Sequence, residues 1–417
     1  MRLNISALAP VGKRQIEWAE RHMPVMMAIR REMSRKKPLE GLRVGMTLHV
    51  EAKTAALVRT LVAGGAEVSI SGCNPLSTKD EVVAALSSEG ISVHAWRGQS
   101  ERDYYANINR VLDHRPNILI DDGADLISTV HSKRQEQIDD IIGGCEETTT
   151  GVNRLRAMAA DGVLRFPVMA VNDTPAKRLF DNRFGTAEST LQGIMTATNT
   201  LIAGKHVVVV GYGFVGRGIA SRAKGMGAIV TVVETDPIRA LEAAMDGFKV
   251  AKVSEVCRAG DIFITTTGSI NVIRKEHIAK MKDGAILSNS GHFNVEIDIP
   301  ALSKLSVRKR DILDDVTEFQ LRDGRRIYLL AEGRLVNLAG KRSLGHPMEI
   351  MDMSFSLQAL SVEYLVDRGD TLEPKVHEVP EWIDRKVARL KLRSLGLKLE
   401  KPTPEQIKYN RSWLRGT

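Results

Sequence analysis

The sequence predicts an α/β protein with two doubly wound parallel sheets and a C-terminal helical tail. In the first half, short apolar segments alternate with helical patterns, which is typical of parallel sheets. The second half opens with a glycine-rich turn between two apolar strands, and 417 residues suffice for two or three domains. We expect one domain at residues 1–183 with 341–373, a second at 184–340, and a tail at 374–417.

Helices and strands are expected to alternate along the first domain. Helical patterns cover residues 54–63, 80–88, 104–112 and 16–35, and Pro24 should kink or divide the last of these. Strand patterns cover residues 43–50, 67–70, 91–96 and 117–121. Ligands of such sheets bind beyond the carboxyl ends of the strands. His49 and the pair Asp121 and Asp122 follow strands there, so a site is expected beside them.

The glycine-rich turn predicts a dinucleotide site. Four valines, residues 207–210, lead into Gly211, Gly213 and Gly216. The three glycines allow a tight turn, close approach of a pyrophosphate and close packing of the following helix. The next strand pattern, residues 229–233, ends at Glu234, whose carboxylate can accept from ribose hydroxyls and would repel a 2′-phosphate. We therefore expect NAD rather than NADP.

The remaining patterns extend this second domain. Residues 260–267, 284–288 and 326–331 are predicted strands. The loop 289–293 should bring His292 beside the nicotinamide. A helical pattern over residues 348–364 can return the chain to the first domain.

Charge does not indicate nucleic-acid binding. The net charge is +8, but ten basic residues and only two acids lie between residues 385 and 415. Leucines interleave with them (Leu390, Leu392, Leu395, Leu397 and Leu399), which favours packing against protein. No apolar run reaches a membrane span, and the N-terminus has no secretory apolar segment, so a cytoplasmic protein is expected. The cysteines and histidines show no metal-ligand spacing, and no metal is predicted.

Several linked motifs carry a family resemblance. They are LHVEAKTA around His49, NPLSTKD at 74–80, DDGAD at 121–125, EETTTG at 146–151, KRLFDN at 177–182, GYGFVGRG at 211–218, GHFNVEID at 291–298 and AEGRLVNLA at 331–339. Over nearly its whole length the chain resembles the S-adenosylhomocysteine hydrolase family, in the HxEAKT form of archaeal and thermophile members. The resemblance implies a small-molecule substrate, catalytic NAD and a homo-oligomer, with a tetramer as the expected size.

The resemblance also implies roles for individual residues. His49, Asp122, Lys177 and His292 would be catalytic, and Lys177 would take the 3′-hydroxyl proton, which requires its pKa to be lowered. Substrate contacts would come from Glu51, Lys53, Thr54, Asp122, Glu147, Lys177, Asp181, His346 and Met351. Cofactor contacts would come from Thr148, Thr149, Thr150, Asn182, Gly211, Gly213, Phe214, Val215, Gly216, Arg217, Gly218, Glu234, Arg239, Thr267, Ser290, Gly291, His292 and Asn337.

The implied chemistry is a hydrolysis that uses NAD as a catalyst. Oxidation at C3′ of the ribose acidifies the C4′ proton, and loss of that proton expels homocysteine from C5′. Water then adds, and reduction at C3′ completes a net hydrolysis. A simple NAD-dependent dehydrogenase that releases NADH, and a catalytically silent binding protein, are the rival functions. The complete lysine, aspartate and histidine set argues against the silent protein.

The chain departs from the usual family pattern in four respects. Glu51 and Lys53 replace the threonine and glutamate of animal members, and a donor-only lysine suits a 6-oxo purine, so S-inosylhomocysteine is an alternative substrate. Lys79 replaces a glutamine that accompanies a monovalent cation, and its ammonium could substitute for that cation. The gate segment 340–344 is longer by about two residues, and the tail lacks the lysine- and tyrosine-bearing end that contacts a neighbouring subunit's NAD.

Overall fold

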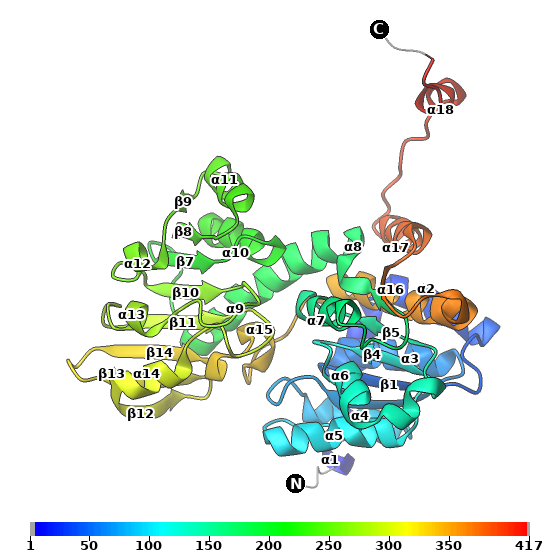
Figure 1. Cartoon of the computed structure of the whole chain (residues 1–417), viewed down its shortest axis with the longest axis horizontal. Helices are drawn as coiled ribbons and strands as arrows, with labels where there is room; N and C mark the ends of the chain where they lie inside the picture. Colours follow the sequence, from blue (N-terminus) through cyan, green and yellow to red (C-terminus); the bar gives the residue numbers. More distant parts are fainter. Residues whose placement is uncertain (1–4, 415–417) are drawn as a thin grey trace.

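The computed structural model describes residues 5–414 and divides into two α/β lobes (Figure 1). The first lobe contains a seven-stranded sheet in the order β15-β6-β5-β4-β1-β2-β3, and every pairing in it is parallel. Its strands are β1 (Arg43–Leu48), β2 (Glu67–Gly72), β3 (Ser92–His94), β4 (Ile118–Asp121), β5 (Gly143–Glu146), β6 (Val168–Ala170) and β15 (Val376–Glu378).

Helices cover this sheet and bury two apolar clusters against it. They are α1 (Ile5–Arg21), α2 (Pro24–Lys36), α3 (Ala52–Ala63), α4 (Asp80–Ser88), α5 (Glu101–Asp113), α6 (Asp125–Lys133), α7 (Thr149–Ala160), α16 (Met348–Arg368) and α17 (Glu381–Ser394), with short 3₁₀ turns at Gln135–Asp140, Val171–Asp173 and Gly369–Thr371. The predicted division at Pro24 is confirmed, because proline lacks the amide that a helix interior needs but suits a first turn. The sequence pattern placed the start of the first helix at residue 16, but the helix begins at Ile5.

The second lobe contains an eight-stranded sheet in the order β12-β13-β14-β11-β10-β7-β8-β9. Its strands are β7 (His206–Val210), β8 (Ile229–Val233), β9 (Lys249–Val250), β10 (Ile262–Thr265), β11 (Ala285–Asn289), β12 (Ser306–Leu313), β13 (Val316–Leu321) and β14 (Arg326–Leu330). Its helices are α9 (Thr186–Thr198), α10 (Phe214–Gly225), α11 (Pro237–Met245), α12 (Val253–Val256), α13 (Lys275–Ile278), α14 (Ile299–Leu305) and α15 (Val336–Ala339), with a 3₁₀ turn at Ala331–Gly333.

The predicted α/β fold with two parallel sheets is confirmed, and one edge of the second sheet adds an antiparallel part. β12, β13 and β14 pair antiparallel, whereas the strands from β14 to β9 are parallel. Only Asp314 and Asp315 lie between β12 and β13. A two-residue connection can form a hairpin but cannot make the crossover that a parallel pair needs.

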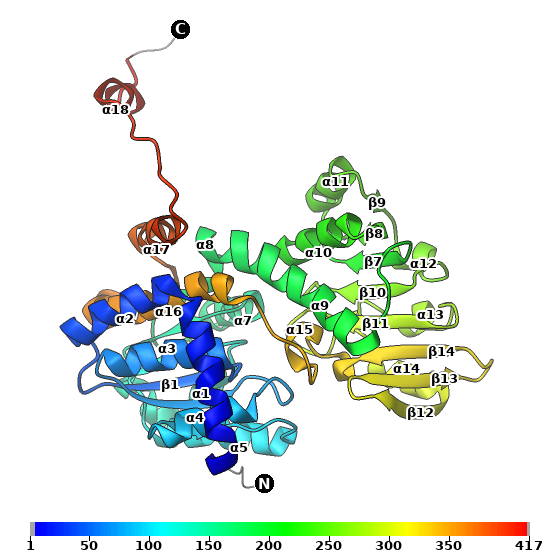
Figure 2. The ribbon, with the colours of Figure 1, turned by 180° about the vertical axis from the view of Figure 1, so that it is seen from behind.

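Two connections join the lobes, as the reverse view shows (Figure 2). The first is a nearly unbroken helical stretch of α8 (Pro175–Lys177), a π-helix at Arg178–Gly185, and α9. The second is the segment between α15 and α16, residues 340–347, called here the crossing segment.

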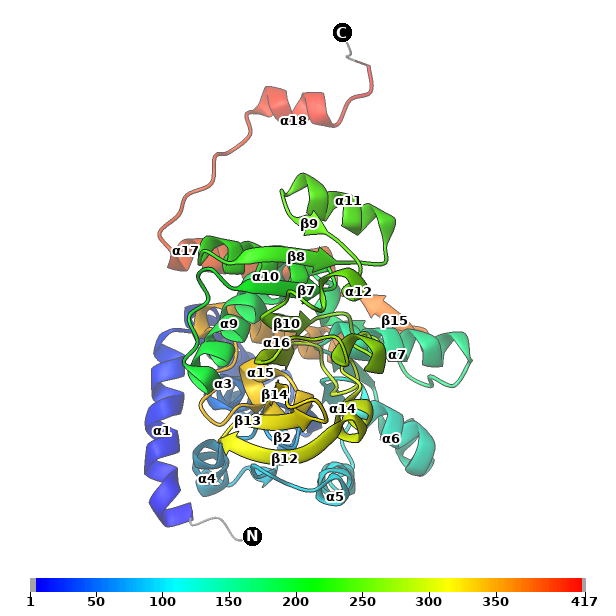
Figure 3. The same ribbon diagram turned by 90° about the vertical axis from the view of Figure 1, so that its left-hand side faces the viewer.

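The predicted tail divides into two parts with different packing. β15 is an edge strand of the first sheet, and α17 packs against α16 and α2 with Ile383 and Val387 buried. Leu390 packs against the same core, whereas Leu395, Leu397 and Leu399 are exposed. Residues 395–414 run away from the body and end in α18 (Pro404–Asn410), as Figure 3 shows. The packing therefore changes after Ser394, not at residue 374.

Candidate active site

A cavity of about 440 Å³ lies between the lobes and is lined by residues of both. In the first sheet the strand order reverses between β1 and β4, and in the second between β7 and β10. Ligands of doubly wound sheets bind at such reversal points. His49 follows β1, Asp122 follows β4, Gly211 follows β7 and Thr266 follows β10, and all four line the cavity.

Asp122 lies at the centre of a group of neutral side chains. Its carboxyl oxygens are 3.4 Å from His49 Nε2, 3.5 Å from His292 Nδ1 and 3.4 Å from the Cys73 thiol, which donates to it. Burial and then the Glu147 charge raise the pKa of Asp122 to about 8. Burial lowers the pKa of His292 to about 4, and burial with the neighbouring His292 charge lowers that of His49 well below its usual value. At neutral pH the site thus holds a protonated acid between two uncharged imidazoles.

The π-helix at Arg178–Gly185 presents Asp181 and Asn182 to the cavity, and Lys177 lies immediately before it. Lys177 Nζ donates to Asn182 Oδ1 at 2.8 Å and lies 3.4 Å from Asp181 Oδ2 and 3.6 Å from Glu147 Oε1. The wider π turn lets residues four and five apart share one face. Burial lowers the pKa of Lys177, but the charges of Asp181, Glu147 and Asp122 outweigh it and raise that pKa. The lowering of the Lys177 pKa that its role as a base requires does not come from the surrounding side chains, because Asp181, Glu147 and Asp122 raise it.

Helix α16 and the crossing segment hold the two carboxylates beside Lys177. Ser354 Oγ donates to Asp181 Oδ2 at 2.7 Å, and Gln358 Nε2 donates to Glu147 Oε2 at 2.5 Å. His346 Nδ1 lies 2.7 Å from Asp181 Oδ1, and its Nε2 is 3.3 Å from Thr186 Oγ1. The returning helix therefore holds these two carboxylates from positions 173 and 211 residues later in the chain.

The end of the cavity beside α3 carries a buried ion pair. Lys53 Nζ lies 2.9 Å from Glu51 Oε1 and donates to the Leu344 carbonyl at 2.6 Å. Lys79 Nζ donates to the Ser343 carbonyl at 2.8 Å, and burial lowers its pKa. The longer gate segment, residues 340–344, is thus held by two ammonium groups of the first lobe.

The second-lobe half of the cavity fits a dinucleotide. Gly211 has φ +104°, a conformation that L side chains rarely adopt, and a Cβ at Gly216 would lie 1.9 Å from the Gly211 carbonyl oxygen. A Cβ at Gly213 would meet only Arg239, so the space before the N-terminus of α10 is open to a phosphate. The Glu234 carboxylate accepts from the amides of Tyr212, Thr235 and Asp236, which orients it at the end of β8.

Most predicted site residues line this cavity, and five do not. The lining includes His49, Glu51, Thr54, Asp122, Glu147, Thr148, Thr149, Thr150, Lys177, Asp181, Asn182, Gly211, Gly213, Phe214, Val215, Glu234, Arg239, Thr267, Ser290, Gly291, His292, His346 and Met351. Outside it, Lys53 pairs with Glu51, Arg217 pairs with Glu242, and Asn337 donates to Ser189 Oγ at 3.2 Å. Gly216 and Gly218 lie in helix packing contacts.

Sequence reasoning missed several lining residues. Leu335, Leu338 and Phe355 give the cavity an apolar wall, and Asn172 donates through its amide to Thr149. Phe355 lies four residues after Met351, so a helical face could have revealed it. Asn172 follows no local pattern, because only the fold brings it to Thr149.

Two further features carry less chemistry. The ligand atoms of His49, Cys73 and Asp122 lie within 4.8 Å of one another, a grouping that sequence spacing did not indicate. Burial raises the pKa values of Cys73 and Asp122, and their protonated forms are poor metal ligands.

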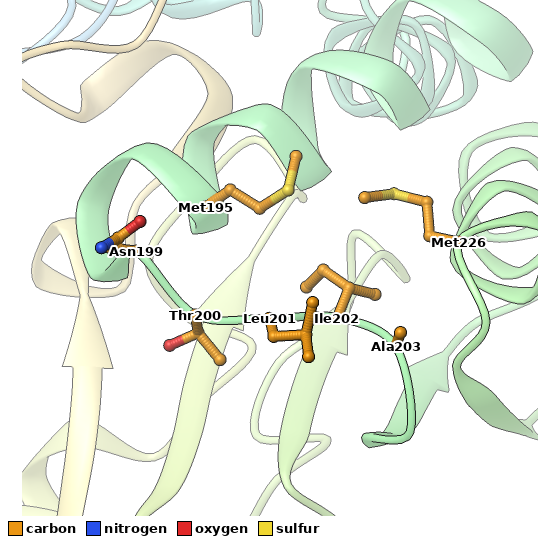
Figure 4. A pocket seen from close by; sticks show the side chains of 7 residues that line it. All are labelled: Met195, Asn199, Thr200, Leu201, Ile202, Ala203 and Met226. Atoms are coloured by element: carbon orange, nitrogen blue, oxygen red, sulfur yellow. The ribbon is translucent and has the colours of Figure 1, made fainter.

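A second pocket lies between the end of α9 and Met226 (Figure 4). Its lining residues, none of them titratable, are Met195, Asn199, Thr200, Leu201, Ile202, Ala203 and Met226. Within residues 5–414 no helix is long and apolar enough to cross a membrane.

Comparison with known proteins identifies the family. Residues 3–143 match the model described as S-adenosyl-L-homocysteine hydrolase, and residues 182–343 match its NAD binding domain. The chain is 60% identical to the S-inosyl-L-homocysteine hydrolase of Methanopyrus kandleri, over 99% of this chain and 97% of that one. It is 58% identical to the adenosylhomocysteinase of Pyrococcus abyssi with the same coverage, and 57% identical to that of Aquifex aeolicus over 99% and 98%. The dinucleotide site is therefore an NAD site, and the chain belongs to the S-adenosyl-L-homocysteine hydrolase family.

Proposed function

We propose that this enzyme hydrolyses the thioether of S-adenosyl-L-homocysteine, reversibly, to adenosine and L-homocysteine. The observation that carries the proposal is one cavity in which a glycine-turn NAD site meets Lys177, a protonated Asp122 and two neutral histidines. The identity to adenosylhomocysteinases over almost the whole chain supports it.

Lys177 is the proposed base for the 3′-hydroxyl. NAD, when bound, supplies the reversible oxidation at C3′ that makes the C4′ proton acidic. Glu147 and Asp181 accept from the ribose hydroxyls and keep them beside the Lys177 amine. The same two carboxylates stabilise the ammonium form of Lys177. A ribose hydroxyl that donates to them weakens this stabilisation, which lowers the pKa of Lys177 and assists release of its proton.

Asp122, His49 and His292 are the proposed acid and base groups at C4′ and C5′. A neutral imidazole can take the C4′ proton, and the protonated Asp122 carboxyl can deliver one to the departing sulfur. In the reverse sense the same groups activate the entering water. Leu335, Leu338 and Phe355 exclude bulk water from the reacting carbon atoms.

S-inosyl-L-homocysteine is the alternative substrate, and the Lys53 ion pair favours it. Glu51 could accept from a 6-amino group, but its contact with Lys53 suits a carboxylate that only pairs with the ammonium and holds it toward the base. An ammonium that faces an amine leaves two donors opposed, which costs about 1–3 kcal/mol, or about 5- to 150-fold in specificity.

The test compares kcat/KM for the adenosyl and inosyl substrates with one preparation, for wild type and Lys53→Glu. If Lys53 reads the base, wild type prefers the inosyl substrate and the variant shifts toward the adenosyl one. An adenosyl preference that Lys53→Glu leaves unaltered would assign the enzyme as an ordinary adenosylhomocysteinase. Net accumulation of free NADH with either substrate would instead favour the simple dehydrogenase.

The functional unit that we propose is a cytoplasmic homo-oligomer of four chains. The first lobe binds substrate, the second binds NAD, and the lobes close about the two connections at residues 182–185 and 339–345. The exposed leucines and basic residues of 395–414 suit packing against another copy near its cofactor lobe. No nucleic-acid or membrane partner is proposed.

A further inference from the structure

Two side chains on one face of α16 hold the two ribose-site carboxylates. Ser354 and Gln358 are four residues apart, which aligns them along the helix. The Ser354 hydroxyl donates to Asp181, and the Gln358 amide donates to Glu147. Ser354 and Gln358 are completely buried, and Asp181 and Glu147 are 1% and 5% exposed. Water therefore has little access to compete for these bonds.

Asp122 receives much weaker donors than these two carboxylates. Its partners are the Cys73 thiol and the rings of His49 and His292, all at 3.4–3.5 Å. A thiol is a weak donor, whereas amide and hydroxyl donors favour the ionised form of a carboxyl group. The strong neutral donors of the site thus serve Glu147 and Asp181 and not Asp122.

We propose that Gln358 and Ser354 are positioning residues that decide which carboxyl group of the site carries the proton. Their donation keeps Glu147 and Asp181 ionised, and the proton resides on Asp122, where the reaction needs an acid. This inference rests on the proposed function, because it assigns the acid used at C5′.

Charged groups around the three carboxyls agree with this distribution. Glu147 faces Lys177, Asp181, Asp122 and His346, and Asp122 also faces Asp121. The pKa of Glu147 is raised overall, chiefly by burial and further by the Asp181 charge, and Lys177 and Gln358 oppose that rise. Burial also opposes ionisation of Asp181, yet His346 and Lys177 hold its pKa well below the usual value. Glu147 is therefore the carboxylate that depends most on a neutral donor.

Substitution of Gln358 in two opposite senses tests the inference. Gln358→Met removes the donor, so Glu147 protonates more readily and the acid limb of the kcat/KM profile moves to higher pH. A donor to a charged group is worth about 10- to 100-fold, so we expect that loss at neutral pH, with recovery as pH rises. Gln358→Glu donates only while it is protonated, and its activity should fall as pH rises. A residue that only fills space would not produce opposite pH dependences.

Variants of the same helix provide the controls. Ser354→Ala should move the profile in the same direction as Gln358→Met. Ser356→Ala removes an equally buried hydroxyl that has no hydrogen-bond partner in the described part of the chain, and should leave the profile unchanged. If wild type turns over and both Gln358 variants give the wild-type profile scaled by a constant, the inference is overturned.

Infrared absorption of protonated carboxyl groups gives a second measurement that needs no turnover. Burial also raises the pKa values of Asp121 and Glu146, so the measurement is a difference spectrum at pH 7. The difference between NAD-loaded wild type and Asp122→Asn should contain a protonated-carboxyl band, and the difference between Gln358→Met and wild type should contain another. If wild type and Asp122→Asn give the same protonated-carboxyl absorption, the inference is overturned even if neither substrate reacts. Absence of turnover alone overturns only the proposed function.

Discussion

At the scale of single residues, the environment of Lys177 sets the pH dependence of oxidation. Three carboxyl groups raise its pKa, so the lysine is an ammonium at neutral pH and must lose a proton before it can act as a base. We expect the rate of bound-NADH formation in wild type, followed by absorbance, to increase from pH 7 to 9. Lys177→Met should retain NAD, slow this step by about 10²–10⁴-fold and abolish the increase. An unchanged rate would remove Lys177 from the base role.

Asp122 makes a prediction about stability that needs no substrate. The pKa of Asp122 in the folded state, about 8, lies above the ordinary value of 3.8 for this group, so the folded state holds a proton that the unfolded state has lost between these pH values. The stability from that proton is complete below about pH 4 and is lost as pH rises through about 8. Asp122→Asn keeps a neutral group, so its melting temperature relative to wild type should increase from pH 5 to 8 and then level off. A constant difference across this range would show that Asp122 is ionised when folded.

At the scale of elements, α10 offers a matched pair of glycines. A Cβ at Gly218 would lie 1.9 Å from the Arg183 carbonyl oxygen in the π-helix, whereas a Cβ at Gly225 would meet nothing within 4 Å. Gly218→Ala should therefore destabilise the protein by about 1–3 kcal/mol and reduce NAD retention, because it moves the helix that carries Asp181 and Asn182. Gly225→Ala should stabilise it by about 0.5–1 kcal/mol. Chemical unfolding measures both, and equal effects would mean that the π-helix tolerates displacement.

At the scale of the whole molecule, the C-terminal residues separate assembly from folding. Deletion of residues 395–417 removes exposed leucines and should leave the melting temperature of the folded unit nearly unchanged. Light scattering should then show a smaller assembly, and the amount of NAD that stays bound through purification should fall. Deletion of residues 385–417 also removes Val387 and the Lys391 contact to Asp352, and should destabilise the first lobe. If the protein that lacks residues 395–417 keeps its full assembly and its NAD, residues 395–414 have no role between subunits.

The sequence by itself determined the features that depend on local patterns. The alternation of strands and helices predicted both sheets, because burial periodicity and glycine turns are visible within a few consecutive residues. The linked motifs predicted the family and most of the residues that line the cavity. Pro24 likewise predicted the helix boundary, since the missing amide is a property of that residue alone.

Only the tertiary structure decided the features that depend on distant residues. The raised pKa of Lys177 comes from Asp122, Glu147 and Asp181, which three different segments bring together. The donors Ser354 and Gln358 reach Asp181 and Glu147 across 173 and 211 positions of sequence. The antiparallel β12–β13 edge and the packing of α17 against α2 are also long-range outcomes. Electrostatic shifts and buried hydrogen bonds depend on distances in space, which no short pattern in the chain encodes.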